Sequence, residues 1–236
     1  MTMLWDVYTD PKLTKHENNS GARKTMTLIE TSALLENLYW ITFLAVVVSS
    51  ASGVLKAGAR QFDLFGVIII AIATGLGGGS LRDMLLDRPV FWIHDQMFFI
   101  ASITSAVVIF FLARLLTISP KHFLIADAAG LAAFGVAGTL VSLMAGVPAL
   151  TSSFMGVMTG TMGGIFRDVL CNEQPVVFSS PLYATVSWVG SLMFIGLLYL
   201  NIDITLSAIC AGSAIFISRL LAIRYRISLP KFRFKS

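Results

Sequence analysis

The sequence contains few charged residues. Only 13% of its 236 residues are Asp, Glu, Lys or Arg, about half the share of an ordinary soluble domain, whereas 56% are hydrophobic. A chain of this composition fits a lipid bilayer as its solvent. Because backbone polar groups in a bilayer must be hydrogen-bonded internally, we expect an all-α integral membrane protein in the cell inner membrane.

Cysteine and histidine are also scarce. Cys171 and Cys210 lie in or beside apolar segments without metal-ligand spacing, so they are expected to be structural thiols. His16, His94 and His122 are isolated along the chain, which predicts that there is no metal site. No Ser-His-Asp set or paired carboxylates share one pathway, so the sequence predicts neither an enzyme nor a bound cofactor.

Long apolar segments take up most of the chain. A helix needs about 20 apolar residues to cross the hydrocarbon core, and seven segments are near that length. The connections between them are short, so function must lie within the helices. We expect seven transmembrane helices over residues 38–55, 64–86, 97–117, 123–146, 150–171, 182–200 and 204–222.

The distribution of lysine and arginine predicts the orientation. Basic loops stay on the cytoplasmic side, and the C-terminal segment is strongly basic. We therefore expect a cytoplasmic C-terminus and an outer N-terminus, although the basic residues of the N-terminal tail depart from this rule. A basic tail beside anionic lipid also explains the net charge of +4 without nucleic acid as a partner. The C-terminal basic residues are Arg219, Arg224, Arg226, Lys231, Arg233 and Lys235.

The chain contains an internal repeat. Shifting it by 85 residues superposes Thr74-Gly-Leu-Gly-Gly-Gly-Ser-Leu-Arg-Asp83 on Thr159-Gly-Thr-Met-Gly-Gly-Ile-Phe-Arg-Asp168. Each copy spans three helices, so consecutive copies enter the membrane in opposite senses and form inverted repeats. The predicted units are a polar tail (1–27), the first three-helix repeat (28–120), the second, inverted repeat (121–201), a seventh helix (202–224) and a basic cytoplasmic tail (225–236).

The repeated glycines weaken their helices by up to about 1 kcal/mol each relative to alanine. We therefore expect helices 2 and 5 to be broken at these strings, with freed carbonyls facing an ion pathway. Close helix packing at small residues is the alternative interpretation. The predicted pathway residues are Gly77, Gly78, Gly79, Gly163 and Gly164, with hydroxyls from Thr74, Ser80, Thr159 and Thr161.

An Arg-Asp pair follows each glycine string and lies within or near the membrane. One interpretation is a pair of salt bridges between the repeats, Arg82 with Asp168 and Arg167 with Asp83. The other is direct contact with the permeating species, so that these four residues tune or gate the pathway.

Three further charged residues are candidates for gating. Arg114 and Asp127 could pair across the short link between the third and fourth segments, in a structural or a gating role. Lys56 ends the first segment, where a lysine more often reaches to the headgroups than lines a pore.

The doubled glycine motif resembles that of the bacterial TRIC-type family, which is similar to trimeric intracellular cation channels and is also described as a glycine transporter family. The resemblance covers nearly all of residues 38–222. It implies seven spans, a homotrimer, and a potassium-permeable pore in each protomer, lined by kinked second and fifth helices. The second copy departs from the family's triple glycine at Met162, so the two halves need not coordinate an ion equally.

The residues and the resemblance together predict a monovalent cation channel that conducts K⁺ or Na⁺, with membrane lipid as its surroundings and as a further ligand. The alternative is a secondary transporter of glycine or another small zwitterion, because the ends of half-helices can hold a carboxylate and an ammonium group.

Overall fold

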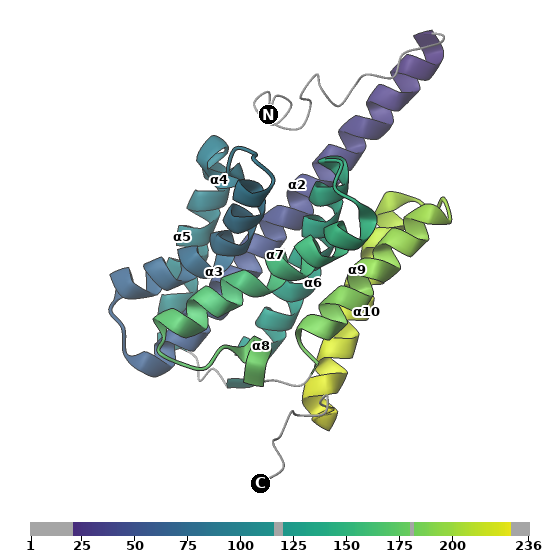
Figure 1. Cartoon of the computed structure of the whole chain (residues 1–236). Helices are drawn as coiled ribbons and strands as arrows, with labels where there is room; N and C mark the ends of the chain where they lie inside the picture. Colours follow the sequence, from purple (N-terminus) through teal and green to yellow (C-terminus); the bar gives the residue numbers. More distant parts are fainter. Residues whose placement is uncertain (1–20, 116–119, 180–181, 228–236) are drawn as a thin grey trace.

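The computed structural model describes residues 21–115, 120–179 and 182–227, with side chains from Leu35 onward. The described residues form helices and connecting turns, without strands (Figure 1). The elements are α2 (Gly21–Ala57), the short 3-10 helix η1 (Gly58–Arg60), α3 (Leu64–Leu85), α4 (Phe91–His94), α5 (Gln96–Leu115), α6 (Pro120–Met144), α7 (Ala149–Leu170), α8 (Val176–Ser179), α9 (Ala184–Tyr199) and α10 (Ile204–Tyr225).

The seven apolar segments correspond to the seven long helices, with bounds that mostly agree within a few residues. The exception is α2, which begins at Gly21 and so includes residues assigned to the polar tail. The short helices α4 and α8 were not predicted from the sequence, and each follows a repeated Arg-Asp motif after a short turn. The N-terminal tail up to residue 20 and the basic residues after 227 lie outside the described residues.

Five described helices are long and apolar enough to cross a membrane. α9 is apolar but has only 16 residues, and α7 has the length of α3 but carries several threonines and serines. Helices of this length and composition are typical of an integral membrane protein. The five are Leu35–Ala57 of α2, α3, α5, His122–Met144 of α6, and α10.

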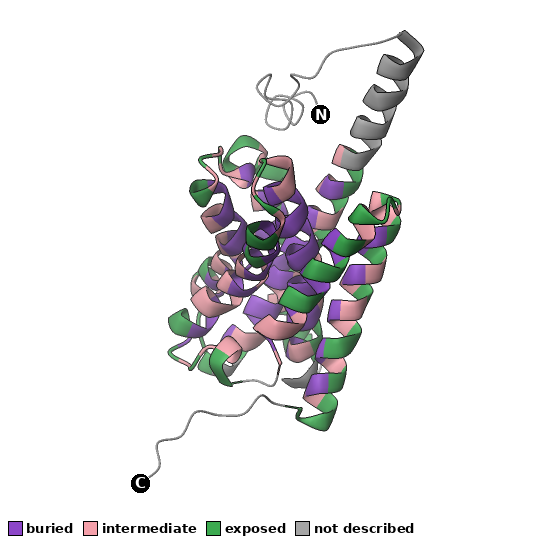
Figure 2. Ribbon diagram, turned by 45° about the vertical axis from the view of Figure 1, so that its right-hand side comes forward, coloured by how far each residue is buried: buried purple, intermediate pink, exposed green. Residues whose placement is uncertain are grey.

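The long helices pack in two similar groups. In the first half α2, α3 and α5 pack on one another, and in the second half α6, α7 and α9 do the same. The two groups meet along α3 and α7 and along α2 and α6, while α10 packs on α6 and α9. Buried residues gather in the middle of this bundle (Figure 2). The repeat in the sequence is therefore also a repeat of helix contacts.

The backbones of the two halves meet at the glycine strings. A Cβ atom added to Gly78 would fall on the carbonyl oxygen of Thr159, and one added to Gly163 would fall on the carbonyl oxygen of Thr74. These two contacts are equivalent under the 85-residue shift. Thr74 precedes Gly78 along α3, whereas their partners run in the reverse order along α7, with Gly163 after Thr159. α3 and α7 therefore cross backbone to backbone, in a contact that only glycine permits.

The expected break at the glycine strings is absent. α3 is continuously α-helical from Leu64 to Leu85, and α7 from Ala149 to Leu170. Because an uninterrupted helix uses its carbonyls internally, these backbones offer no freed oxygens in this conformation. The packing of the two helices at the crossing offsets the poor helix propensity of glycine, and the close-packing interpretation describes this contact correctly.

The crossing predicts that Gly78→Ala is destabilising. The added methyl group would meet backbone, which cannot rotate away, so we expect a loss of about 1–3 kcal/mol and a lower melting temperature in detergent. Gly196→Ala is the matched control, because Gly196 has no atom within 4 Å of an added Cβ. The control should be neutral or more stable by up to about 1 kcal/mol. Equal melting temperatures for the two variants would contradict the crossing.

Candidate functional site

Each Arg-Asp pair has the same buried geometry. Arg82 donates from Nε to Oδ1 of Asp83 at 2.8 Å, and Arg167 donates to Asp168 at the same distance. The second oxygen of each aspartate caps the short helix that follows, accepting from the backbone N–H of Phe91 at 3.0 Å and of Val176 at 2.8 Å. All four charged side chains are at most 4% exposed.

The predicted salt bridges between the repeats are therefore wrong, because each arginine pairs with the aspartate next to it in sequence. The pairs lie four or five residues beyond the crossing of α3 and α7. At a rise of 1.5 Å per residue, this places each pair about 7 Å from the crossing along its own helix. α3 and α7 run in opposite directions at the crossing, so the two Arg-Asp pairs lie on opposite sides of it. Arg82 is therefore separated from Asp168.

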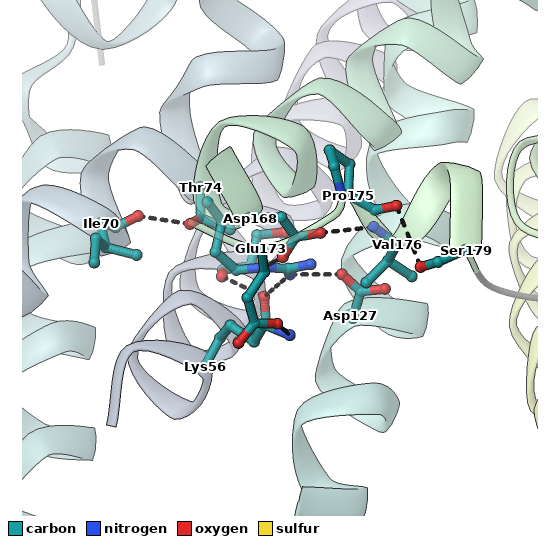
Figure 3. Close-up of polar contacts among 12 residues, drawn as sticks. Lys56, Ile70, Thr74, Asp127, Asp168, Glu173, Pro175, Val176 and Ser179 are labelled. Atoms are coloured by element: carbon teal, nitrogen blue, oxygen red, sulfur yellow. Dashed lines mark hydrogen bonds and ion pairs between the residues drawn. The ribbon is translucent and has the colours of Figure 1, made fainter. Parts of the chain in front are cut away.

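Among the described residues, the second pair has polar partners beyond those of the first pair. Figure 3 shows the contacts around Asp168 and Asp127. Arg167 donates from Nη1 to Asp127 of α6 at 2.7 Å and to Ser52 of α2 at 3.2 Å. Its guanidinium also lies 4.6 Å from the centroid of the Phe123 ring. This arginine therefore joins α2, α6 and α7, and two carboxylates compensate its charge.

The predicted pair between Arg114 and Asp127 is also wrong, because Asp127 binds an arginine of another helix. Asp127 turns into the bundle, where it is 5% exposed and binds Arg167. Arg114 is exposed and lies 4.4 Å from the ring centroid of Phe110 on its own helix. A carboxylate this deeply buried needs a buried cation, and Arg167 supplies it.

Lys56 joins a second set of charges near the end of α2. It forms a salt bridge with Glu173, which follows α7, and Arg60 binds the same carboxylate at 3.0 Å. These contacts tie the end of α2 to the turn after α7, and sequence analysis did not single out Glu173. The hydrogen bond with Lys56, assisted by Arg60, lowers the pKa of the Glu173 carboxyl below its ordinary value of 4.5.

The predicted pathway residues lie at the crossing or on its flanks. Thr74 and Thr159 are buried, and their hydroxyls donate to the carbonyls of Ile70 and Met155 in their own helices. Ser80 donates to a carbonyl of its helix and accepts from the indole of Trp92 at 2.8 Å. The hydrogens of these hydroxyls are therefore used in local hydrogen bonds, while lone pairs of the oxygens can still accept. Thr161 is also buried.

The flanks of the crossing differ between the two halves. An added Cβ at Gly79 would lie 2.6 Å from the ring of Phe91, whereas the three atoms nearest to one at the equivalent Gly164 are polar. Those atoms are the hydroxyl of Tyr183 at 3.4 Å, Nη2 of Arg167 at 3.5 Å and Oδ1 of Asp127 at 3.7 Å. One side of the crossing is thus covered by an aromatic ring and the other by a polar cluster.

Comparisons with known proteins agree with this duplicated arrangement. A family model described as "Glycine transporter" matches the chain twice, over residues 39–114 and 124–199, with the same 85-residue shift. A solved structure of a TRIC trimeric intracellular cation channel orthologue from Rhodobacter sphaeroides is 30% identical, with a TM-score of 0.77, and the match covers 80% of this chain and 98% of that one. The chain belongs to the bacterial TRIC-type family.

Further relatives of this TRIC-type chain are membrane proteins. The UPF0126 inner membrane protein YadS of Escherichia coli is 34% identical over 83% of this chain and 96% of its own length. A UPF0126 membrane protein of Vibrio cholerae is 37% identical over 86% of each chain. The structure of a prokaryotic TRIC channel in 0.5 M KCl matches at 28% identity and a TM-score of 0.74, over 81% of this chain and 98% of that one. The resemblance inferred from the glycine motif is confirmed.

The unequal partners of the two arginines predict unequal losses of stability. Asp83→Asn would leave Arg82 without its carboxylate, and we expect a loss of about 3–5 kcal/mol. Asp168→Asn should cost less, because Arg167 keeps Asp127. Melting temperatures in detergent would measure both losses. Asp203→Asn is the control, since asparagine also caps a helix such as α10. A larger loss for Asp168→Asn would contradict the assignment of partners.

The Glu173 salt bridge predicts a loss of stability in acid. Because its folded pKa is lowered, its contribution is present above the ordinary value of 4.5 and is lost as pH falls through the folded pKa. We expect a contribution of up to about 1 kcal/mol at neutral pH, since the carboxylate is partly exposed. Melting temperatures between about pH 6 and pH 3 should fall less steeply for Glu173→Gln than for the wild type.

Lys56→Met should remove the larger part of the same acid dependence, because Arg60 still binds Glu173, and the double variant should lose no more of it than Glu173→Gln alone. An unchanged slope in Glu173→Gln would show that another group carries the acid dependence.

Proposed function

We propose that this TRIC-type protein is a monovalent cation channel, permeable to potassium, with a pore inside each protomer. The observation that carries the proposal is its likeness over about four fifths of the chain to solved TRIC cation channels, at 28–30% identity. The buried, duplicated site at the meeting of α3 and α7 supports a pathway within one chain.

In this proposal the seven long helices all cross the membrane, as two inverted three-helix repeats followed by α10. The opposite sequence order of α3 and α7 at their crossing supports the inversion. The C-terminus is cytoplasmic and the N-terminus outside, in agreement with the basic C-terminal segment. The channels assemble as homotrimers, in keeping with the similar channel from Rhodobacter sphaeroides, which is described as trimeric.

The pathway follows the crossing of α3 and α7. The glycine strings leave little side-chain volume there, so a small separation of the helices would open a passage beside Gly164 without removing any large residue. The backbone of Gly77, Gly78, Gly79, Gly163 and Gly164 and the hydroxyls of Thr74, Ser80, Thr159 and Thr161 would line that passage. The neighbouring Arg-Asp pairs would set its electrostatic potential.

A glycine carrier is the second candidate, because the matching family model is described as a glycine transporter. A carrier would use the same glycine crossing but would keep one side closed at all times. The two mechanisms differ in their electrical behaviour, which makes them separable by experiment.

The deciding experiment is single-channel recording of the purified protein in planar bilayers under a potassium gradient. A channel gives discrete current steps that reverse near the potassium potential. Gly78→Leu should abolish these steps, because its side chain would be forced into the backbone of α7. Gly196→Leu is the control, and its current should be that of the wild type because a Cβ added to Gly196 meets open space.

Electrical silence of the wild-type protein, together with saturable glycine uptake into liposomes, would contradict the channel and favour the carrier. Currents that persist in Gly78→Leu would place the pathway elsewhere in the protein.

A further inference from the structure

The short helix α4 covers the first-half flank of the crossing. Its first residue, Phe91, is 7% exposed and lies against Gly79, where an added Cβ would come within 2.6 Å of the ring. Its second residue, Trp92, donates from the indole Nε1 to the hydroxyl of Ser80 at 2.8 Å. Two neighbouring side chains of α4 thus lie on two neighbouring residues of the predicted pathway.

The charged pair of the first half anchors this cover. Asp83 accepts from the backbone N–H of Phe91 at 3.0 Å, and the guanidinium of Arg82 lies 5.8 Å from the centroid of the Phe91 ring. On its other side the ring packs edge-on against Phe98 of α5, with centroids 4.9 Å apart. Because Arg82 and Asp83 belong to α3, the position of α4 depends on the helix that carries the glycine string.

The matching short helix of the second half, α8, makes different contacts. Its Val176 binds Asp168 through the same backbone hydrogen bond, and α4 and α8 lie at opposite ends of the bundle (Figure 1). The residues of α8 are half-buried or exposed, with Phe178 at 73%. Ser80 corresponds to Ile165, which carries no hydroxyl for an indole to bind. The two ends share the anchor but differ in what it holds.

A cation that passes the first-half flank would meet the cover. The indole N–H of Trp92 can only donate, and it uses a lone pair of the Ser80 oxygen that a cation could otherwise bind. The ring of Phe91 lines the same flank with apolar atoms, and hydrophobic constrictions stop ions by excluding water. The cover therefore disfavours a cation at the flank formed by Gly79 and Ser80, which is the first-half mouth of the pathway.

We propose that α4 is a gate, whose aromatic side chains close the first-half mouth while they lie on Gly79 and Ser80. Ions pass when α4 moves away from α3. Asp83 is a positioning residue, because its carboxylate holds the start of α4 by the backbone N–H of Phe91. This inference rests on the proposed channel, and it assigns the gate to the side of the crossing opposite Gly164.

Trp92→Phe tests the gate with little change of shape. The variant keeps an aromatic ring to stack on Phe99 but loses the N–H that binds Ser80. Because this hydrogen bond forms only while α4 is seated, its loss should shift the equilibrium towards the open state. We expect the open probability in planar bilayers to rise about two- to tenfold, as follows from the loss of one ordinary hydrogen bond.

Trp188→Phe is the matched control. The indole of Trp188 donates to the hydroxyl of Ser153 at 3.0 Å, so the same type of bond is lost near the start of α7, away from the glycine string. Both variants should show a similar decrease in melting temperature in detergent. Only Trp92→Phe should show the increase in open probability.

Phe91→Leu is the second gate variant. It removes the aromatic ring beside Gly79, and its open probability should also rise. Phe178→Leu is its control on the exposed face of α8, with the open probability of the wild type. A gain of current distinguishes gating from damage, because a misfolded protein conducts less. If Phe91→Leu does not fold, Trp92→Phe carries the same expectation.

The outcomes separate the gate from the channel. Wild-type current with unchanged open probability in both gate variants would overturn the gate and leave the channel intact. Equal increases in Trp92→Phe and Trp188→Phe would also overturn the gate, because they would show a general loosening. Current in the gate variants of an otherwise silent protein would support the gate and the channel. Silence of the wild type and of both gate variants would overturn the channel and the gate with it.

Discussion

The backbone contact between α3 and α7 is the constraint on which the rest of the structure depends. Gly78 and Gly163 each face a threonine carbonyl of the other helix, so neither position has room for a side chain. This contact brings the two repeats together at one point and directs the charged ends of both helices away from each other. The positions of Arg82 and Arg167, and therefore the partners that each can reach, follow from it.

Local patterns predicted much of this arrangement. The long apolar segments predicted the long helices, and the shared glycine string predicted the duplication that recurs in equivalent contacts 85 residues apart. Gly53 faces the hydroxyl of Thr74 and Gly138 that of Thr159, with an added Cβ at 2.6 and 2.5 Å respectively. Such features are readable because spacing along one helix determines which residues share a face.

Partners distant in sequence could not be predicted in the same way. Whether Arg167 binds Asp83, Asp127 or Asp168 depends on where the helices cross, and no local pattern encodes the crossing. Glu173 was missed because it follows α7 as an ordinary turn residue, and only the fold brings Lys56 and Arg60 to it. Its replacement of Arg88 under the 85-residue shift, a change of sign between the copies, was the available signal.

The helix break was wrongly predicted because intrinsic propensity was allowed to outweigh tertiary packing. Glycine disfavours an isolated helix, yet in a membrane it also allows the close approach that stabilises one helix against another. The difference between Gly77 in the first copy and Met162 in the second is also explained by packing. Gly77 leaves room for the ring of Phe166, and the residue equivalent to Phe166 in the first copy is the smaller Leu81.

The central claim is that ions pass beside the glycine crossing, and a cysteine at Gly164 tests it most directly. An added Cβ there has no neighbour closer than 3.4 Å, so Gly164→Cys should fold. In a background without Cys171 and Cys210, a small cationic thiol reagent should block potassium current through Gly164→Cys and leave Gly196→Cys unaffected. Full current after complete modification of Gly164→Cys would contradict the account.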